Sequence, residues 1–294
     1  MSHEISRRLA LGRLAGVSAA AVAVGSLAHR AEGAEEPAPV KLKGRINHSV
    51  CRWCYGRLSL DDLCKAAKSM GIASIDLCGP NEWPTLKKYG LTCAMAHGAG
   101  MGIGRGFNRV ESHDKRVESF EALIPKAAKA GLENVICMSG NREGLDDEQG
   151  MKNCAIGVKR LMTLAEAKKV NVVMELLNSR YDHKDYQCDH TAWAVELCKM
   201  VGSERFKLLY DIYHMQLMEG DLINTIKKNI QYIAHFHTGG VPGRHEIDET
   251  QEITYPAVMR AIAESGFKGF VAQEFIPKRD PLESLRQAIQ ICDV

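Results

Sequence analysis

The chain carries almost no net charge, and this absence argues against nucleic acids as its partner. Its 294 residues give a formal net charge of +2. Residues 1–34 hold four of the 38 basic residues and two of the 36 acidic residues, so the rest of the chain is neutral. Proteins that neutralise nucleic-acid phosphates are normally basic. The hydrophobic fraction of 45% and the charged fraction of 25% are typical of a globular protein that is neither disordered nor collagen-like.

The chain also lacks the cysteine pattern of a structural zinc site. Cys51 and Cys54 have the spacing of a redox or metal-binding motif, but no second pair completes a four-cysteine site. Most of the ten cysteines stand within apolar patterns, where free cysteine packs as a small core residue. We expect a structural role for them, and the sequence leaves open whether Cys51 and Cys54 form a disulfide.

Residues 1–34 resemble an export signal of the twin-arginine type. Residues 6–11 (SRRLAL) resemble the twin-arginine motif, and residues 14–28 form an apolar run. This run is short for a bilayer whose hydrocarbon core is roughly 30 Å thick. We therefore expect a periplasmic protein with no stable membrane span after cleavage, and residues 35–43 as a linker. An uncleaved anchor, or a cytoplasmic protein with an N-terminal tail, is the alternative.

From residue 44 onward, β-rich runs alternate with helical patterns without an intervening linker. Helical segments end in glycine just before an apolar run at Gly71, Gly131 and Gly266, for example, as where a helix leads into a strand. No G-x-G-x-x-G motif follows a strand into a helix, which disfavours a dinucleotide-binding sheet. We therefore predict one α/β domain at 44–294, a (β/α)8 TIM barrel. Its predicted strands are 44–50, 72–78, 91–97, 133–138, 171–177, 206–211, 231–237 and 268–274.

Four consecutive predicted strands end in side chains that commonly bind metals. Barrel enzymes carry their chemistry at the carboxyl ends of the strands, so these side chains should lie on one rim. Three carboxylates and one imidazole suit Mn²⁺ or Mg²⁺, with Co²⁺ or Zn²⁺ as alternatives. The cation would neutralise carboxylates that otherwise repel one another. The predicted metal ligands are Glu175, Asp211, His237 and Glu274.

A metal at this rim could hold a carbonyl oxygen together with the oxygen of an adjacent hydroxyl group. It would acidify the hydrogen on the intervening carbon and stabilise the resulting enediolate. Glu175 and Glu274 would flank the substrate, where one could remove the proton and the other return it. The proton could return to the neighbouring carbon or to the opposite face of the same carbon, and the sequence does not decide between isomerisation and epimerisation.

Three segments around these strand ends carry a family resemblance. Residues 174–178 (MELLN), 210–216 (YDIYHMQ) and 237–246 (HTGGVPGRHE) resemble the hydroxypyruvate isomerase family, which belongs to the xylose isomerase-like barrels. The resemblance covers about residues 44–294. It implies interconversion of hydroxypyruvate and tartronate semialdehyde, with a ketose 3-epimerase or another sugar isomerase as the alternative. One departure favours the epimerases: His237 stands where bacterial hydroxypyruvate isomerases have glutamine.

The resemblance also implies roles for individual residues. The four strand-end residues would bind the metal, and Glu175 and Glu274 would be the catalytic pair that exchanges the proton. Arg244 matches a substrate-binding arginine, whose planar fork suits a carboxylate. Trp53 and His183 are expected on the same face of the barrel. The candidate substrate-binding residues are His214, Arg244, His97 and Glu246.

Two other functions remain as alternatives. A phosphodiesterase of the endonuclease IV type would need a trinuclear zinc site and a basic groove, and the sequence offers one metal cluster and no excess of positive charge. A non-catalytic periplasmic protein that binds a sugar or an acid is the second alternative, and exchange of carbon-bound hydrogen in a substrate would exclude it. A small-molecule partner is common to the isomerase and the binding protein, and a homo-oligomer is compatible with both.

Overall fold

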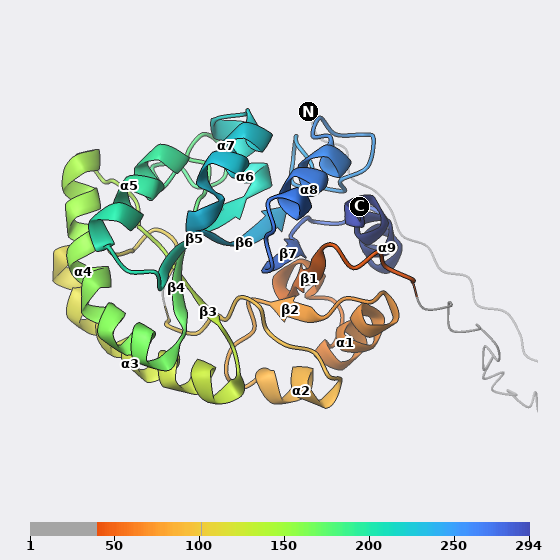
Figure 1. Ribbon diagram of the computed structural model, residues 1–294, viewed down its shortest axis with the longest axis horizontal. Helices are drawn as coiled ribbons and strands as arrows, with labels where there is room; N and C mark the ends of the chain where they lie inside the picture. Colours follow the sequence, from red (N-terminus) through yellow and green to blue (C-terminus); the bar gives the residue numbers. More distant parts are fainter. Residues whose placement is uncertain (1–39, 101) are drawn as a thin grey trace, which may run out of the picture. The chain divides into compact units, whose positions relative to one another are not determined.

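The computed structural model describes residues 40–100 and 102–294 (Figure 1). The predicted export signal and residues 35–39 of the predicted linker lie outside this part of the chain. Among the described residues, no helix combines the length and the apolar character that a membrane crossing requires.

Seven parallel strands form one curved sheet, and the helices lie around its outer face (Figure 1). The strands are hydrogen-bonded in the order β2-β1-β7-β6-β5-β4-β3. Nearly every strand residue is buried, as expected for parallel strands that are covered by helices. The strands are β1 (Asn47–Cys51), β2 (Ser74–Asp76), β3 (Asn134–Cys137), β4 (Asn171–Glu175), β5 (Phe206–Asp211), β6 (Ile233–Thr238) and β7 (Phe270–Gln273).

The predicted strand at 91–97 is not a continuous strand, although it does occupy the eighth position of the barrel. Thr92 makes a single parallel bridge to Ser74 of β2, and Ala96 makes one to Val135 of β3. Between these bridges the Leu77 amide still donates to the Met95 carbonyl at 2.8 Å, but side chains replace the backbone partners of Ala94. The Ser74 hydroxyl accepts from the Ala94 amide at 2.7 Å, and the Asn134 amide group donates to the Ala94 carbonyl at 2.8 Å. The predicted TIM barrel is confirmed, with this segment lying between β2 and β3.

Three helices begin at a residue whose side chain caps the backbone, and α3 ends at a glycine as the sequence pattern predicts. Ser59, Asp146 and Asp280 accept hydrogen bonds from backbone amides at the starts of α1, α4 and α9. Gly131 adopts a φ of 77° after α3, a conformation that glycine reaches without strain. The helices are α1 (Leu60–Ser69), α2 (Trp83–Lys88), α3 (His113–Ala130), α4 (Asp147–Lys168), α5 (Thr191–Val201), α6 (Ile212–Met218), α7 (Leu222–Asn229), α8 (Tyr255–Glu264) and α9 (Pro281–Cys292), with 3-10 turns η1 (Arg52–Tyr55), η2 (Val110–Ser112) and η3 (Ile230–Tyr232).

All ten cysteines are free, and only Cys54 is partly exposed. The burial expected from their apolar surroundings is therefore found for the other nine. Cys51 and Cys54 form no disulfide in this structure.

Candidate active site

The carboxyl ends of β4 to β7 bring the four predicted metal ligands together. Asp211 and His237 are directly paired in the parallel register of β5 and β6, which places both side chains at one level of the barrel. The ligand atoms of all four residues lie within 4.8 Å of one another, and all four residues are buried. These residues are Glu175, Asp211, His237 and Glu274.

The surroundings of His237 show whether the site fits a metal ion. Its Nδ1 lies 2.6 Å from Oε2 of Glu274 and 3.5 Å from Oε1 of Glu175. Among the described residues, no group meets this buried nitrogen with the geometry of a hydrogen bond. A buried ring nitrogen that faces carboxylates without a hydrogen bond, within a donor set of three carboxylates and one imidazole, fits a divalent cation.

The buried carboxylates differ in their affinity for protons. Burial opposes the ionisation of Glu274, yet Arg244 and His237 hold its pKa well below the usual range. Burial raises the pKa of Asp211 to about 7, and the charge of Glu274 adds to this shift while Arg244 opposes it. Glu274 is therefore ionised near neutral pH, whereas Asp211 retains a proton part of the time. A divalent cation would compete with that proton.

Arg244 links two of the carboxylates to the aromatic wall of the site. Its Nη2 donates to Asp211 Oδ2 at 3.1 Å and to Glu274 Oε2 at 2.6 Å. The guanidinium carbon lies 5.4 Å from the ring centroids of both Trp53 and Tyr213. Trp53 also donates from Nε1 to Glu274 Oε1 at 2.6 Å. Arg244 thus lies at the candidate site, where the sequence predicts it.

A cavity of about 570 Å³ opens beside these carboxylates. Glu175 and Glu274 both contribute to its wall, so the two residues of the predicted proton-transfer pair face the same space. Arg244 and His97 line it as well. The apolar part of the wall includes Leu77, Ile103, Ile136, Met138 and Leu177.

His214 lies behind the ligands rather than in the wall of the cavity. Its ring is buried, and Nδ1 lies 2.6 Å from the amide nitrogen of Asn178. Its Nε2 lies 3.6 Å from Oδ2 of Asp211 and has no hydrogen-bond partner among the described residues. Burial lowers the pKa of His214 well below its usual value, and the charge of Arg244 lowers it further, so the ring is neutral.

Glu246, like His214, lies outside the described wall of the cavity, whereas His97 and Arg244 line it. Its Oε1 accepts from the backbone amides of Lys278 and Arg279 at 2.9 and 3.0 Å, and from the hydroxyl of Ser284 at 2.9 Å. These donors lie just before and within the first turn of α9. Glu246 therefore connects two loops of the barrel rim, and we leave it out of the proposed substrate contacts.

The sequence predicted two further residues on this face of the barrel without assigning them a function, and two buried residues near the site were not predicted. Trp53 and His183 line the cavity. Asp76 and His235 are buried behind His237 and were not singled out. The available signals were that Asp76 follows an apolar residue near a strand end, and that His235 and His237 share one side of a strand by their spacing of two.

Comparison with known proteins matches the chain to one family of TIM barrels. The sequence pattern of the xylose isomerase-like TIM barrel family matches residues 64–293. A putative hydroxypyruvate isomerase of Homo sapiens is 31% identical over 113 residues, which are 38% of this chain and 41% of that protein. A 2-oxo-tetronate isomerase of Cupriavidus necator is 34% identical over 114 residues, or 39% of this chain and 43% of that protein. The matches thus span less than half the length of these two relatives.

Solved structures show the same fold. The crystal structure of an AP endonuclease of family 2 from Brucella melitensis superposes with a TM-score of 0.71 at 23% identity, covering 82% of this chain and 96% of that one. At this level of identity the similarity establishes the barrel, and the chemistry must be argued from the site.

Proposed function

Because the chain belongs to the xylose isomerase-like TIM barrel family, we propose that it is a metal-dependent isomerase that moves a proton in a small hydroxy-carbonyl compound through an enediolate. One observation carries this proposal. Glu175 and Glu274 both line one cavity and both face the buried Nδ1 of His237. A proton-transfer pair beside a metal-ligand set is what this reaction requires.

The chain's own residues provide the acid–base chemistry. Glu175 and Glu274 face the same cavity, so one of them, as the carboxylate, would take the carbon-bound proton. The other, entering the step in its protonated form, would donate its own proton to the enediolate carbon. Arg244 stands at the wall with a guanidinium group that suits a negatively charged substrate oxygen. The metal, held by the three carboxylates and His237, would polarise the carbonyl and stabilise negative charge on the enediolate oxygens.

The leading substrate pair is hydroxypyruvate and tartronate semialdehyde. The names of the human and Cupriavidus necator relatives support an oxo acid as substrate, and Arg244 would pair with its carboxylate. A ketose 3-epimerase is the second candidate, favoured by a cavity of about 570 Å³ that has room for a longer substrate. Mn²⁺ or Mg²⁺ is the proposed ion, because the donor set is rich in oxygen.

Removal and return of the metal tests this proposal. The protein would be stripped with a chelator and dialysed, and conversion of hydroxypyruvate, a 2-oxo-tetronate and a panel of ketoses followed by proton NMR. We expect no conversion by the stripped protein and restored conversion of one compound with Mn²⁺ or Mg²⁺. Glu175→Gln should lower the restored activity at least 100-fold, whereas the exposed control Glu196→Gln should not. Full activity in the stripped protein would contradict the proposal.

We also propose that residues 1–34 direct export, as their twin-arginine pattern indicates. The protein would then be found in the periplasmic fraction, and the double substitution Arg7→Lys and Arg8→Lys would retain it in the cytoplasm. An unchanged distribution between the two fractions would contradict this proposal.

A further inference from the structure

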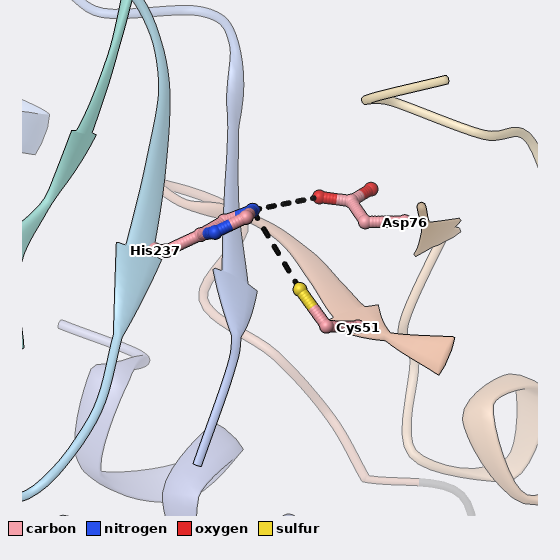
Figure 2. A group of neighbouring side chains, drawn as sticks. All are labelled: Cys51, Asp76 and His237. Atoms are coloured by element: carbon pink, nitrogen blue, oxygen red, sulfur yellow. Dashed lines mark hydrogen bonds and ion pairs between the residues drawn. The ribbon is translucent and has the colours of Figure 1, made fainter. Parts of the chain in front are cut away.

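A second polar cluster lies directly behind the metal ligand His237. Figure 2 shows Cys51 at the end of β1 and Asp76 at the end of β2, with both side chains directed at the ring of His237 on β6. All three side chains are fully buried. None of them belongs to the described wall of the substrate cavity, so the cluster can affect the reaction only through His237.

Asp76 has two hydrogen-bond donors at one carboxylate oxygen and two histidine rings near the other. Its Oδ1 accepts from the hydroxyl of Ser49 at 2.7 Å and from the hydroxyl of Ser74 at 3.1 Å. Its Oδ2 lies 2.5 Å from Nε2 of His235 and 3.6 Å from Nε2 of His237. A buried carboxylate is costly unless such groups satisfy it. Its negative charge is therefore fixed at a defined distance from the ring of His237.

The two nitrogens of His237 face opposite surroundings. Nδ1 is directed at the carboxylates of Glu274 and Glu175, whereas Nε2 lies 3.6 Å from the sulfur of Cys51 and 3.6 Å from Asp76. The negative charge of Asp76 beside Nε2 favours a proton on that nitrogen, and the sulfur of Cys51 can then accept from it. The lone pair then remains on Nδ1, which is the nitrogen that would meet a cation.

We propose that Asp76 is a positioning residue that fixes the tautomer and the ring orientation of His237 and thereby sets the metal affinity of the site. This inference rests on the metal centre of the proposed function. Histidine ligands generally depend on such a partner at their second nitrogen, and loss of the partner typically weakens metal binding about 10- to 100-fold. Cys51 contributes a second, weaker acceptor on the same side of the ring.

A metal ion bound by the cluster itself is the competing interpretation. Oδ2 of Asp76 is in direct ion-pair contact with Nε2 of His235 at 2.5 Å. Its Oδ1 accepts hydrogen bonds from the hydroxyls of Ser49 and Ser74. Both oxygens of Asp76 therefore have partners of their own, which favours a supporting carboxylate over a ligand of a second metal ion.

Metal affinity in solution, measured on the full chain without substrate, tests the proposal. Mn²⁺ would be titrated calorimetrically into chelator-stripped wild type, Asp76→Asn and Asp189→Asn. Asp189 is a matched control, since it is also buried and hydrogen-bonded but pairs with Arg142. We expect one ion per chain in the wild type, about 10- to 100-fold weaker binding in Asp76→Asn, and unchanged affinity in Asp189→Asn.

A double-mutant cycle separates positioning from a general loss of structure. The amide oxygen of a glutamine ligand has no tautomer to fix, so Asp76→Asn should not weaken Mn²⁺ binding further in a His237→Gln background. If Asp76→Asn does not fold, Ser49→Ala removes one support of Asp76 and should lower the affinity by a smaller factor. Equal affinity of wild type and Asp76→Asn, or an equal effect in both backgrounds, would overturn the inference.

Two further outcomes of the titration would lead to different conclusions. Two ions in the wild type, with one lost in Asp76→Asn, would overturn the positioning role in favour of a metal site at Cys51, Asp76 and His237. No Mn²⁺, Mg²⁺, Co²⁺ or Zn²⁺ binding by the wild type would overturn the proposed function together with this inference.

Discussion

At the scale of single residues, Arg244 makes contacts that no other side chain could make from the same position. Its Nη2 donates to both Asp211 and Glu274, its Nε donates to the Glu274 carbonyl, and its guanidinium group lies over the rings of Trp53 and Tyr213. Lysine has one donor nitrogen and no planar group, so it would lose the bond to the carbonyl and the contact with both rings.

Arg244→Lys should therefore lower kcat/KM by about 10- to 100-fold, as expected from the loss of a charged hydrogen bond worth about 1.5–3 kcal/mol. We expect part of the loss as a higher KM for an oxo-acid substrate. Steady-state kinetics with saturating Mn²⁺ measures it, and thermal unfolding of the variant checks that the fold is intact. Unchanged kinetic constants would show that Arg244 does not touch the substrate.

The cluster of four candidate metal ligands was predictable from the sequence, whereas the residues packed behind it were not. Each ligand follows an apolar run at a strand end, so a repeated pattern reveals it. Asp76 acts on His237 from a strand that is not its neighbour in the sheet. Such a contact crosses the interior of the barrel, and the order of residues along the chain does not show which inward side chains meet there.

At the scale of elements, the loop after β6 is connected to α9 through Glu246. Three donors hold its carboxylate, and these hydrogen bonds outweigh the effect of burial and lower its pKa to about 2. The folded-state pKa lies below the ordinary value of 4.5, so the stabilisation is complete above that value and is lost as the pH falls toward 2.

Glu246→Gln should accordingly lower the free energy of unfolding at pH 7 by about 1–3 kcal/mol. The difference from the wild type should shrink as the pH is lowered from 5 to 3, because the carboxylate of the unfolded wild type binds a proton in this range while the folded one stays ionised. Urea unfolding at several pH values measures this. A difference that is constant across this range would show that the charge of Glu246 makes no contribution.

The prediction of the elements themselves failed at one place for a physical reason. Residues 91–97 have the apolar, β-prone composition of a strand, and the chain does follow the barrel wall there. The backbone ladder is interrupted because Ser74 and Asn134 satisfy the backbone of Ala94 with their side chains. The interruption depends on polar side chains of neighbouring strands, so it could not be predicted from residues 91–97 alone.

At the scale of the whole molecule, a bound metal should stabilise the barrel. The ion would hold the ends of four strands together and remove the repulsion between their carboxylates. At a free concentration 100 times the Kd, binding to the folded state alone contributes about 2.7 kcal/mol.

For a domain of this size, that energy corresponds to a rise in Tm of roughly 5–10 °C. Differential scanning calorimetry of the chelator-stripped protein with and without Mn²⁺ measures the shift. Asp211→Ala, which removes one ligand, should show a much smaller rise at the same Mn²⁺ concentration. An equal rise in this variant would place the ion elsewhere on the molecule.

Exchange of carbon-bound hydrogen in D₂O tests the central claim most directly, because it reports proton removal whether the product is an isomer or an epimer. The Mn²⁺-loaded protein would be incubated with hydroxypyruvate and with small ketoses, and deuterium incorporation followed by proton NMR. The account predicts metal-dependent incorporation beside the carbonyl of at least one compound and its loss in Glu274→Gln. Exchange that persists at the wild-type rate in Glu274→Gln, or none with any compound despite a bound ion, would contradict it.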